Sequence, residues 1–153
     1  MRFRMEIDEN LEEDEIILKC RELSQDVQNL QAAIYESLTK RNQFVLYKEN
    51  TEYYLSPSEI LFFETEAKGI MAHTREDVFL VKYKLYELEE ILPGNFLRIS
   101  KSGIVNMNEI FSITRNLTGA SAVEFKGSHK KIFVSRSYYK VLKDKLEEKR
   151  KMI

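Results

Sequence analysis

The chain of 153 residues has few of the residues and none of the motifs that mark common enzymes and metal sites. Its single cysteine, Cys20, excludes an internal disulfide. The chain has only two histidines, and its cysteine and histidines do not have the spacing of a zinc finger. Its five glycines form neither a G-x-G-x-x-G nor a G-x-x-x-x-G-K-[ST] motif, and no G-x-S-x-G elbow occurs. We therefore expect no catalytic residues, no metal and no cofactor, and a protein that is not an enzyme.

Long apolar runs are also missing. No segment approaches the roughly 20 apolar residues that span a bilayer, and residues 1–6 lack the apolar core of a secretory signal. A lone cysteine is typical of a reducing compartment, so we predict a cytoplasmic location. Hydrophobic residues make up 43% of the chain, with nine Phe and eight Tyr, which is enough for one packed domain with a small appendage.

Charge is unevenly distributed along the chain. Residues 1–39 hold four basic and ten acidic side chains, whereas residues 40–153 hold 20 basic and 15 acidic ones. From residue 93 onward the count is 13 basic to 5 acidic. This asymmetry is expected if only the C-terminal half faces a polyanion, although the two halves could also simply attract each other.

The N-terminal 39 residues are predicted to form a ββα unit. Apolar and polar side chains alternate over residues 2–7, and residues 15–20 are the second predicted strand. A helix is predicted over residues 24–38, with Ser24 as its N-cap. Its apolar stripe consists of Leu23, Val27, Leu30, Ile34 and Leu38. The stripe packs either on the neighbouring sheet or against the same helix of a second copy, which makes residues 1–39 a candidate for dimerisation or partner contact.

Residues 42–153 are predicted to form a second, mainly β domain. Short apolar segments separated by turn residues are typical of antiparallel sheets, so the predicted fold class is α+β, mainly β. The predicted strands are 44–47, 53–55, 59–64, 70–73, 78–81, 122–125 and 131–134, with two more in the hairpin over residues 96–113. Helices are predicted over residues 86–92 and from Ser135 or Ser137 onward.

Two polar corners of this domain are candidate phosphate or base contacts. Ser100, Lys101 and Ser102 form the turn of the 96–113 hairpin, where a cation and two hydroxyls suit a phosphate backbone. An ordinary solvated corner is the alternative.

Arg136 stands where a strand passes into a helix, between Ser135 and Ser137. Its guanidinium could donate two hydrogen bonds to a guanine edge, while the serine hydroxyls and the helix N-terminal amides bind a phosphate. A surface arginine beside a capping serine is the alternative. Other cations at loops and strand ends extend this candidate surface: Lys68, Arg98, Lys130, Lys131 and Lys140.

Four ordered segments resemble the LytTR-type DNA-binding domain, and the resemblance covers about residues 42–148. They are EILFFE at 59–64, VFLVKYKLYELEEIL at 78–92, NFLRISKSGIVNMNEIFSI at 95–113 and IFVSRSYYKVLKDKL at 132–146. The resemblance implies an elongated antiparallel β fold that inserts loops, and no recognition helix, into successive major grooves. Members are bacterial transcription regulators that bind imperfect direct repeats of duplex DNA, usually as dimers.

By position, the family's contact sites fall near Lys68, on Lys101 and on Arg136. The acidic N-terminal unit resembles that of small stand-alone LytTR regulators, some of which are thought to be held inactive by a membrane protein. The resemblance therefore implies a homodimeric regulator that binds duplex DNA sequence-specifically, with a membrane protein as inhibitory partner. The alternative is a protein-interaction module whose acidic N-terminal unit binds a regulatory partner.

Overall fold

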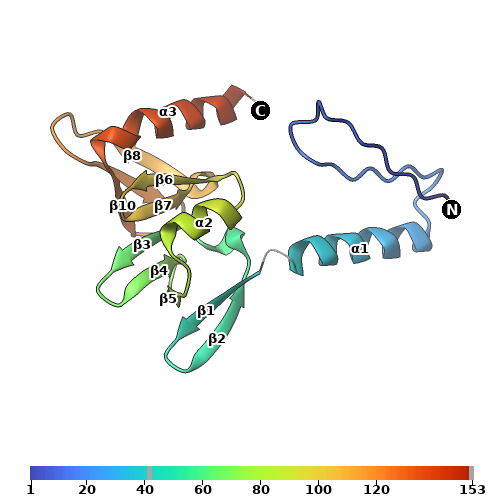
Figure 1. Cartoon of the computed structure of the whole chain (residues 1–153), viewed down its shortest axis with the longest axis horizontal. Coiled ribbons are helices and arrows are strands. Elements are labelled where there is room, and N and C mark those ends of the chain that lie inside the picture. Colours follow the sequence, from blue (N-terminus) through green and yellow to red (C-terminus); the bar gives the residue numbers. More distant parts are fainter. Residues whose placement is uncertain (41–42, 152–153) are drawn as a thin grey trace. The chain divides into compact units, whose positions relative to one another are not determined.

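The computed structural model describes residues 1–40 and 43–151, and the chain divides into two compact units, residues 1–38 and 39–153 (Figure 1). The first unit consists of an irregular segment and most of helix α1, Gln25–Lys40. Ser24 caps α1, because its hydroxyl accepts the backbone N–H of Val27 at 3.3 Å. Asp26 places a negative charge in the first turn, where the helix dipole favours it.

The two strands predicted in the N-terminal unit do not form. Residues 1–24 contain turns and bends but no strand, and the apolar side chains of both predicted strands lie in solvent. Phe3 is 94% exposed and Ile7 86% exposed. A two-stranded ribbon is marginal in water unless something covers its apolar face. Alternation of apolar and polar residues is therefore not enough to form strands here, because the unit offers these residues no packing surface.

The second unit is built on a seven-stranded sheet in which every neighbouring pair is antiparallel, as predicted. The strand order is β2-β1-β5-β4-β3-β7-β6. The strands are β1 (Phe44–Lys48), β2 (Thr51–Leu55), β3 (Phe62–Glu66), β4 (Gly69–His73), β5 (Val78–Val81), β6 (Phe96–Ser100) and β7 (Gly103–Asn106).

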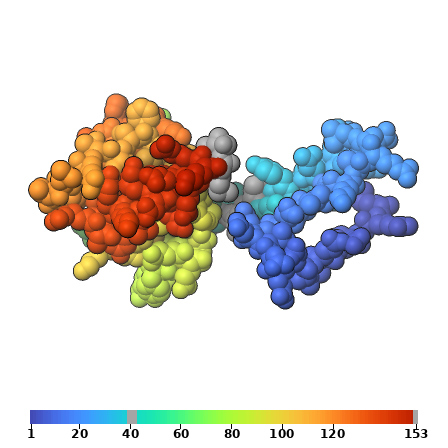
Figure 2. Space-filling view, turned by 90° about the horizontal axis from the view of Figure 1, so that it is seen from above, coloured from blue at the N-terminus to red at the C-terminus, as the bar shows by residue number. Residues whose placement is uncertain are grey.

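A smaller antiparallel sheet of order β10-β9-β8 comes from the C-terminal half of this unit. Its strands are β8 (Ile110–Thr114), β9 (Ser121–Phe125) and β10 (Lys131–Val134). Helix α2, Leu85–Ile91, connects β5 to β6, and α3, Arg136–Lys151, follows β10. In Figure 2 the side chains of α3, in red, lie against the orange small sheet. The helices of the described residues are all too short or too polar to cross a membrane.

Neighbouring residues of the central strand β3 face two different cores. Phe63 packs with Leu85 and Leu88 of α2, whereas Phe62 packs with Phe125 of the small sheet and with residues near α3. Because successive side chains of a strand point to opposite faces, one strand contributes to both layers. The large sheet is therefore covered by α2 on one face and by the small sheet and α3 on the other, and the predicted α+β, mainly β class is confirmed.

Two of the differences between predicted and observed boundaries come from local polar caps. β3 begins at Phe62 and not at Glu59, since Ser56 and Glu59 form a capping box around the 3-10 turn Pro57–Glu59. The predicted 96–113 hairpin is β6, β7, a 3-10 turn at Met107–Glu109 and β8, so it crosses from the large sheet to the small one. Asn106 starts that turn by accepting the N–H of Asn108.

Candidate nucleic-acid interface

Two turns and one helix N-terminus meet at the same end of the large sheet. The β3–β4 turn carries Lys68, and it lies beside the β6–β7 turn because the Thr65 N–H donates to the Ser102 carbonyl at 2.8 Å. Antiparallel pairing of β3 with β7 dictates this arrangement, since β3 ends where β7 begins. The Ser135 N–H donates to the Ile99 carbonyl at 2.9 Å, which brings the start of α3 to the end of β6.

Arg98 shapes the β6–β7 turn. Its Nε donates to the Ser100 carbonyl at 2.7 Å, and its Nη2 donates to the Lys101 carbonyl. Its Nη1 is paired with Glu89 of α2 at 3.1 Å. With three guanidinium nitrogens engaged and the side chain only 20% exposed, Arg98 braces the turn and has few donors left for a ligand.

The remaining residues of this turn present polar groups outward. Lys101 and Ser102 are exposed at its tip, while its carbonyl groups bond inward to Arg98 and Thr65. The Ser100 hydroxyl accepts the Ser102 N–H at 3.1 Å and lies 3.3 Å from the Ser102 hydroxyl. The turn thus offers one cation and two hydroxyls that are already oriented, an arrangement suited to a phosphate group.

Arg136 is the first residue of α3 and is exposed. The Ser135 carbonyl accepts the N–H groups of Tyr138 and Tyr139, and the Ser135 hydroxyl lies 3.4 Å from that of Ser137. The first N–H groups of a helix lack intrahelical partners, and they favour anions. An exposed guanidinium at such a position can reach a base edge or a phosphate while the amides hold a second phosphate.

The other predicted cations have different surroundings. Lys140 is exposed on α3, one turn after Arg136, so it extends the positive surface along the helix. Lys131 begins β10, about 13 Å of strand away from Ser135. It is paired with Glu124 at 3.4 Å. The Nζ of Lys130 donates to the Asp77 carbonyl at 2.6 Å, and burial lowers the pKa of Lys130.

Arg115 joins this surface although nothing in the sequence pattern indicated it, because it lies in the loop between β8 and β9, far from the other candidates in sequence. Its guanidinium lies over the ring of Tyr139, 5.0 Å from the centroid, so it joins the start of α3. A cation stacked on an aromatic face keeps its edge free for other acceptors. Only the docking of α3 on the small sheet reveals this residue.

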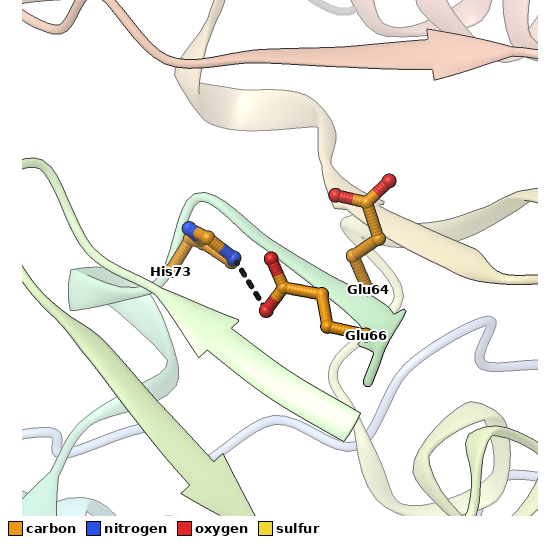
Figure 3. A group of neighbouring side chains, drawn as sticks. All are labelled: Glu64, Glu66 and His73. Atoms are coloured by element: carbon orange, nitrogen blue, oxygen red, sulfur yellow. Dashed lines mark hydrogen bonds and ion pairs between the residues drawn. The ribbon is translucent and has the colours of Figure 1, made fainter. Parts of the chain in front are cut away.

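Sequence analysis also missed a cluster of Glu64, Glu66 and His73 close to the β3–β4 turn. Its ligand-type atoms lie within 4.8 Å of one another, and Nε2 of His73 is 3.4 Å from Oε2 of Glu66 (Figure 3). Alternation along β3 places both glutamates on one face, and the pairing of His73 with Phe62 places the imidazole on the same face.

Burial dominates the electrostatics of this cluster. Burial, followed by the neighbouring Glu66 carboxylate, raises the pKa of Glu64. Burial and then Lys130 lower the pKa of His73, and Glu66 opposes this shift only in part. Burial thus favours the neutral imidazole of His73, which lies beside the half-buried Glu64 and the exposed Glu66.

Residues 50–147 match the family model described as the LytTr DNA-binding domain. An HTH-type transcriptional regulator of Staphylococcus aureus strain NCTC 8325 is 31% identical over 146 residues, which cover 95% of this chain and 98% of that protein. Its counterpart from the bovine strain RF122 is 32% identical over the same length and coverage.

A solved structure shares the fold. It is the LytTr DNA-binding domain of a methyl-accepting/DNA response regulator from Bacillus cereus, with a TM-score of 0.62 and 24% sequence identity. The likeness covers 67% of this chain and 94% of that domain.

Proposed function

This chain belongs to the family of LytTr DNA-binding domains, and we propose that it is a transcriptional regulator that binds duplex DNA sequence-specifically. In this proposal, the β3–β4 turn, the β6–β7 turn and the start of α3 enter the major groove. The observation that carries the proposal is that these three segments, each bearing an exposed cation, meet at one end of the large sheet. A cytoplasmic location belongs to the same proposal.

Loops and a helix N-terminus suit this task better than a recognition helix does. Among the described residues, five strands separate α2 from α3, so these two helices do not form a helix-turn-helix. The outward groups at the interface are Lys68, Lys101 and Arg136, none of which lies in a helix interior. We therefore assign base reading to side chains at turns and to the first residue of α3, although the relatives' names refer to a helix-turn-helix.

The cations divide between base reading and backbone binding. Arg136 can present two parallel N–H donors to the O6 and N7 atoms of guanine, the commonest specific contact in the major groove. Lys68, Lys101 and Lys140 are assigned to phosphates or to single base acceptors, with Ser102 and Ser137 as hydroxyl donors. Lys131 contributes charge at longer range, since Glu124 partly neutralises it.

Selection of bound sequences from random duplex DNA tests this function. We expect the full chain to enrich a short motif that occurs twice in the same orientation, as a dimer on direct repeats would require. Recovery of unrelated sequences after several rounds would contradict sequence-specific binding.

We also propose that the N-terminal unit joins two copies of the chain. Its apolar side chains are exposed in the single chain, including Met5 at 76% and Ile16 at 63%. Exposed apolar residues gathered in one segment mark an interaction surface. A second copy supplies the same alternating segments, so the segments of two copies could pair as strands and cover each other's apolar side chains.

Replacing Ile7 with aspartate should convert the dimer to a monomer without unfolding the chain. Ile7 is 86% exposed, so the single chain loses no packing, whereas a dimer would bury a charge. Sedimentation velocity should give a mass near twice 18.1 kDa for the unaltered chain and near 18.1 kDa for the variant.

Phe111→Asp is the matched control, because Phe111 is 72% exposed but lies outside the N-terminal unit. It should remain dimeric. A monomeric unaltered chain at micromolar concentration, or equal masses for both variants, would contradict this role.

The same unit could instead bind a regulatory protein, including the membrane protein that the family resemblance implies. Its net acidic character and exposed apolar residues favour a partner with a basic, apolar surface. A monomeric chain that still binds its DNA motif tightly would favour this alternative over the homodimer.

A further inference from the structure

We propose that Glu64, Glu66 and His73 form a binding site for a divalent transition-metal ion, with Zn²⁺ as its model. The site lies on β3 and β4, at the base of the turn that carries Lys68. Its effect on DNA binding, described below, rests on the proposed function, but binding of the ion itself does not.

The spacing of the ligand atoms favours coordination over a hydrogen bond. Nε2 of His73 and Oε2 of Glu66 are 3.4 Å apart. Ordinary N–H···O bonds measure about 2.7–3.2 Å. Two ligands bound to one tetrahedral ion at about 2.1 Å each lie about 3.4 Å apart. The Glu64 carboxylate lies within 4.8 Å of the other two groups, so it can serve as the third protein ligand, with water in the fourth position.

The imidazole is held by packing, with its hydrogen-bonding capacity largely unused. His73 is 9% exposed, and its ring stacks on Phe62 with centroids 4.3 Å apart and an interplanar angle of 14°. Its Nδ1 is buried and has no hydrogen-bond partner in the part of the chain that the structure describes. The contact of 3.4 Å to Glu66 engages Nε2 only weakly, whereas a coordinate bond from Nε2 would be stronger, with the ring proton then on Nδ1.

The charges around the cluster also suit a cation. Glu64 and Glu66 lie on the same face of β3 with their carboxylates close together, and a divalent ion between them would offset their repulsion. Lys130 is a competing cation close to His73, but its Nζ donates to the Asp77 carbonyl. An imidazole nitrogen among the ligands selects transition metals over Mg²⁺.

Metal binding would act on the DNA interface through this hairpin. Glu66 is the last residue of β3 and precedes the turn with Lys68, while the adjacent Thr65 is bonded to the β6–β7 turn. The ion would link β3 to β4 and neutralise two negative charges beside a surface proposed to bind phosphates. We therefore expect the metal-loaded chain to bind DNA more tightly.

Calorimetric titration of Zn²⁺ into the metal-stripped full chain tests the site directly. The Cys20→Ser background is used throughout, because the exposed Cys20 thiol could bind Zn²⁺ independently. We expect one Zn²⁺ ion per chain. The affinity should be at least about tenfold lower in Glu66→Gln and in Glu64→Gln, because each substitution replaces a carboxylate ligand with an uncharged amide of nearly the same size. Glu90→Gln, an exposed carboxylate on α2, is the matched control and should bind as the background does.

Co²⁺ absorption supplies a second readout that does not depend on activity. A tetrahedral site with one nitrogen and oxygen ligands should give visible bands that Glu66→Gln abolishes and Glu90→Gln retains. Equal Zn²⁺ affinity in all variants, or no binding in the Cys20→Ser background, would overturn the site.

Affinity for the selected DNA motif, measured with Zn²⁺ and with chelator, separates the two proposals. We expect at least about threefold tighter binding with Zn²⁺ in the background and no difference in Glu66→Gln. DNA binding without any Zn²⁺ uptake would overturn the metal site and leave the DNA-binding function standing. Zn²⁺ uptake without binding of any duplex would overturn the DNA-binding function and leave the metal site standing.

Discussion

Replacing Arg136 with alanine is expected to weaken binding to the selected DNA motif by about 1–3 kcal/mol, or roughly 5- to 150-fold. Binding to unrelated duplexes should weaken far less, because only one positive charge is lost. The expectation follows from the position of Arg136, exposed as the first residue of α3 and next to the β6–β7 turn. Fluorescence anisotropy with matched and scrambled duplexes measures both affinities.

Two control variants separate base reading from charge. Arg136→Lys keeps the positive charge but loses the planar guanidinium with its two parallel donors. This variant should therefore discriminate less between the motif and other sequences while keeping its affinity for unrelated DNA. Lys140→Ala removes an exposed charge one turn further along α3, so it should weaken binding to all sequences alike. Preserved discrimination in Arg136→Lys together with lost discrimination in Lys140→Ala would contradict the roles assigned to these two residues.

Replacing Phe62 with alanine should destabilise the second unit by about 3–5 kcal/mol. Phe62 is 2% exposed, and its ring stacks with those of His73 and Phe125, whose centroids are 4.3 and 5.3 Å away. It therefore joins the large sheet to the small one, and the truncation would open a cavity that stiff strands cannot close. Urea unfolding followed by circular dichroism measures the change in the free energy of unfolding.

Phe133→Ala serves as the control for this prediction. Phe133 is 54% exposed on the small sheet, so its truncation should change stability by about 0.5 kcal/mol or less. Phe62→Leu, which keeps most of the volume, should lose much less than Phe62→Ala. Similar losses for Phe62→Ala and Phe133→Ala would show that the two sheets are not joined through this ring.

Periodicity predicted most of the second unit because its strands are short, apolar and separated by turn residues. It could not show that Phe62 and Phe63 serve different cores, since that depends on which layers cover each face. It also placed strands over residues 2–7 and 15–20, which form no strand and whose side chains are exposed. Ser24 was correctly identified as a helix cap, because a cap depends only on neighbouring residues.

The candidate site was predictable only where its chemistry is local. Arg136 between two serines at a strand-to-helix junction was visible in the sequence, and the structure places it at the start of α3. The surroundings of Arg98 were not visible, because its partners include Glu89 and two backbone carbonyls. The Glu64, Glu66 and His73 cluster was missed because β3 and β4 bring these residues together by strand pairing. Sequence analysis expected no metal, and the proposed metal site departs from that expectation.

The central claim is that three segments at one end of the sheet read the sequence of duplex DNA. The most direct test of this claim compares two affinities of the full chain, one for the selected motif and one for a scrambled duplex. Both are measured over a range of salt concentrations. We predict a motif affinity at least about 10³-fold higher, with both affinities falling as salt rises. Equal affinities for the two duplexes at every salt concentration would contradict the claim.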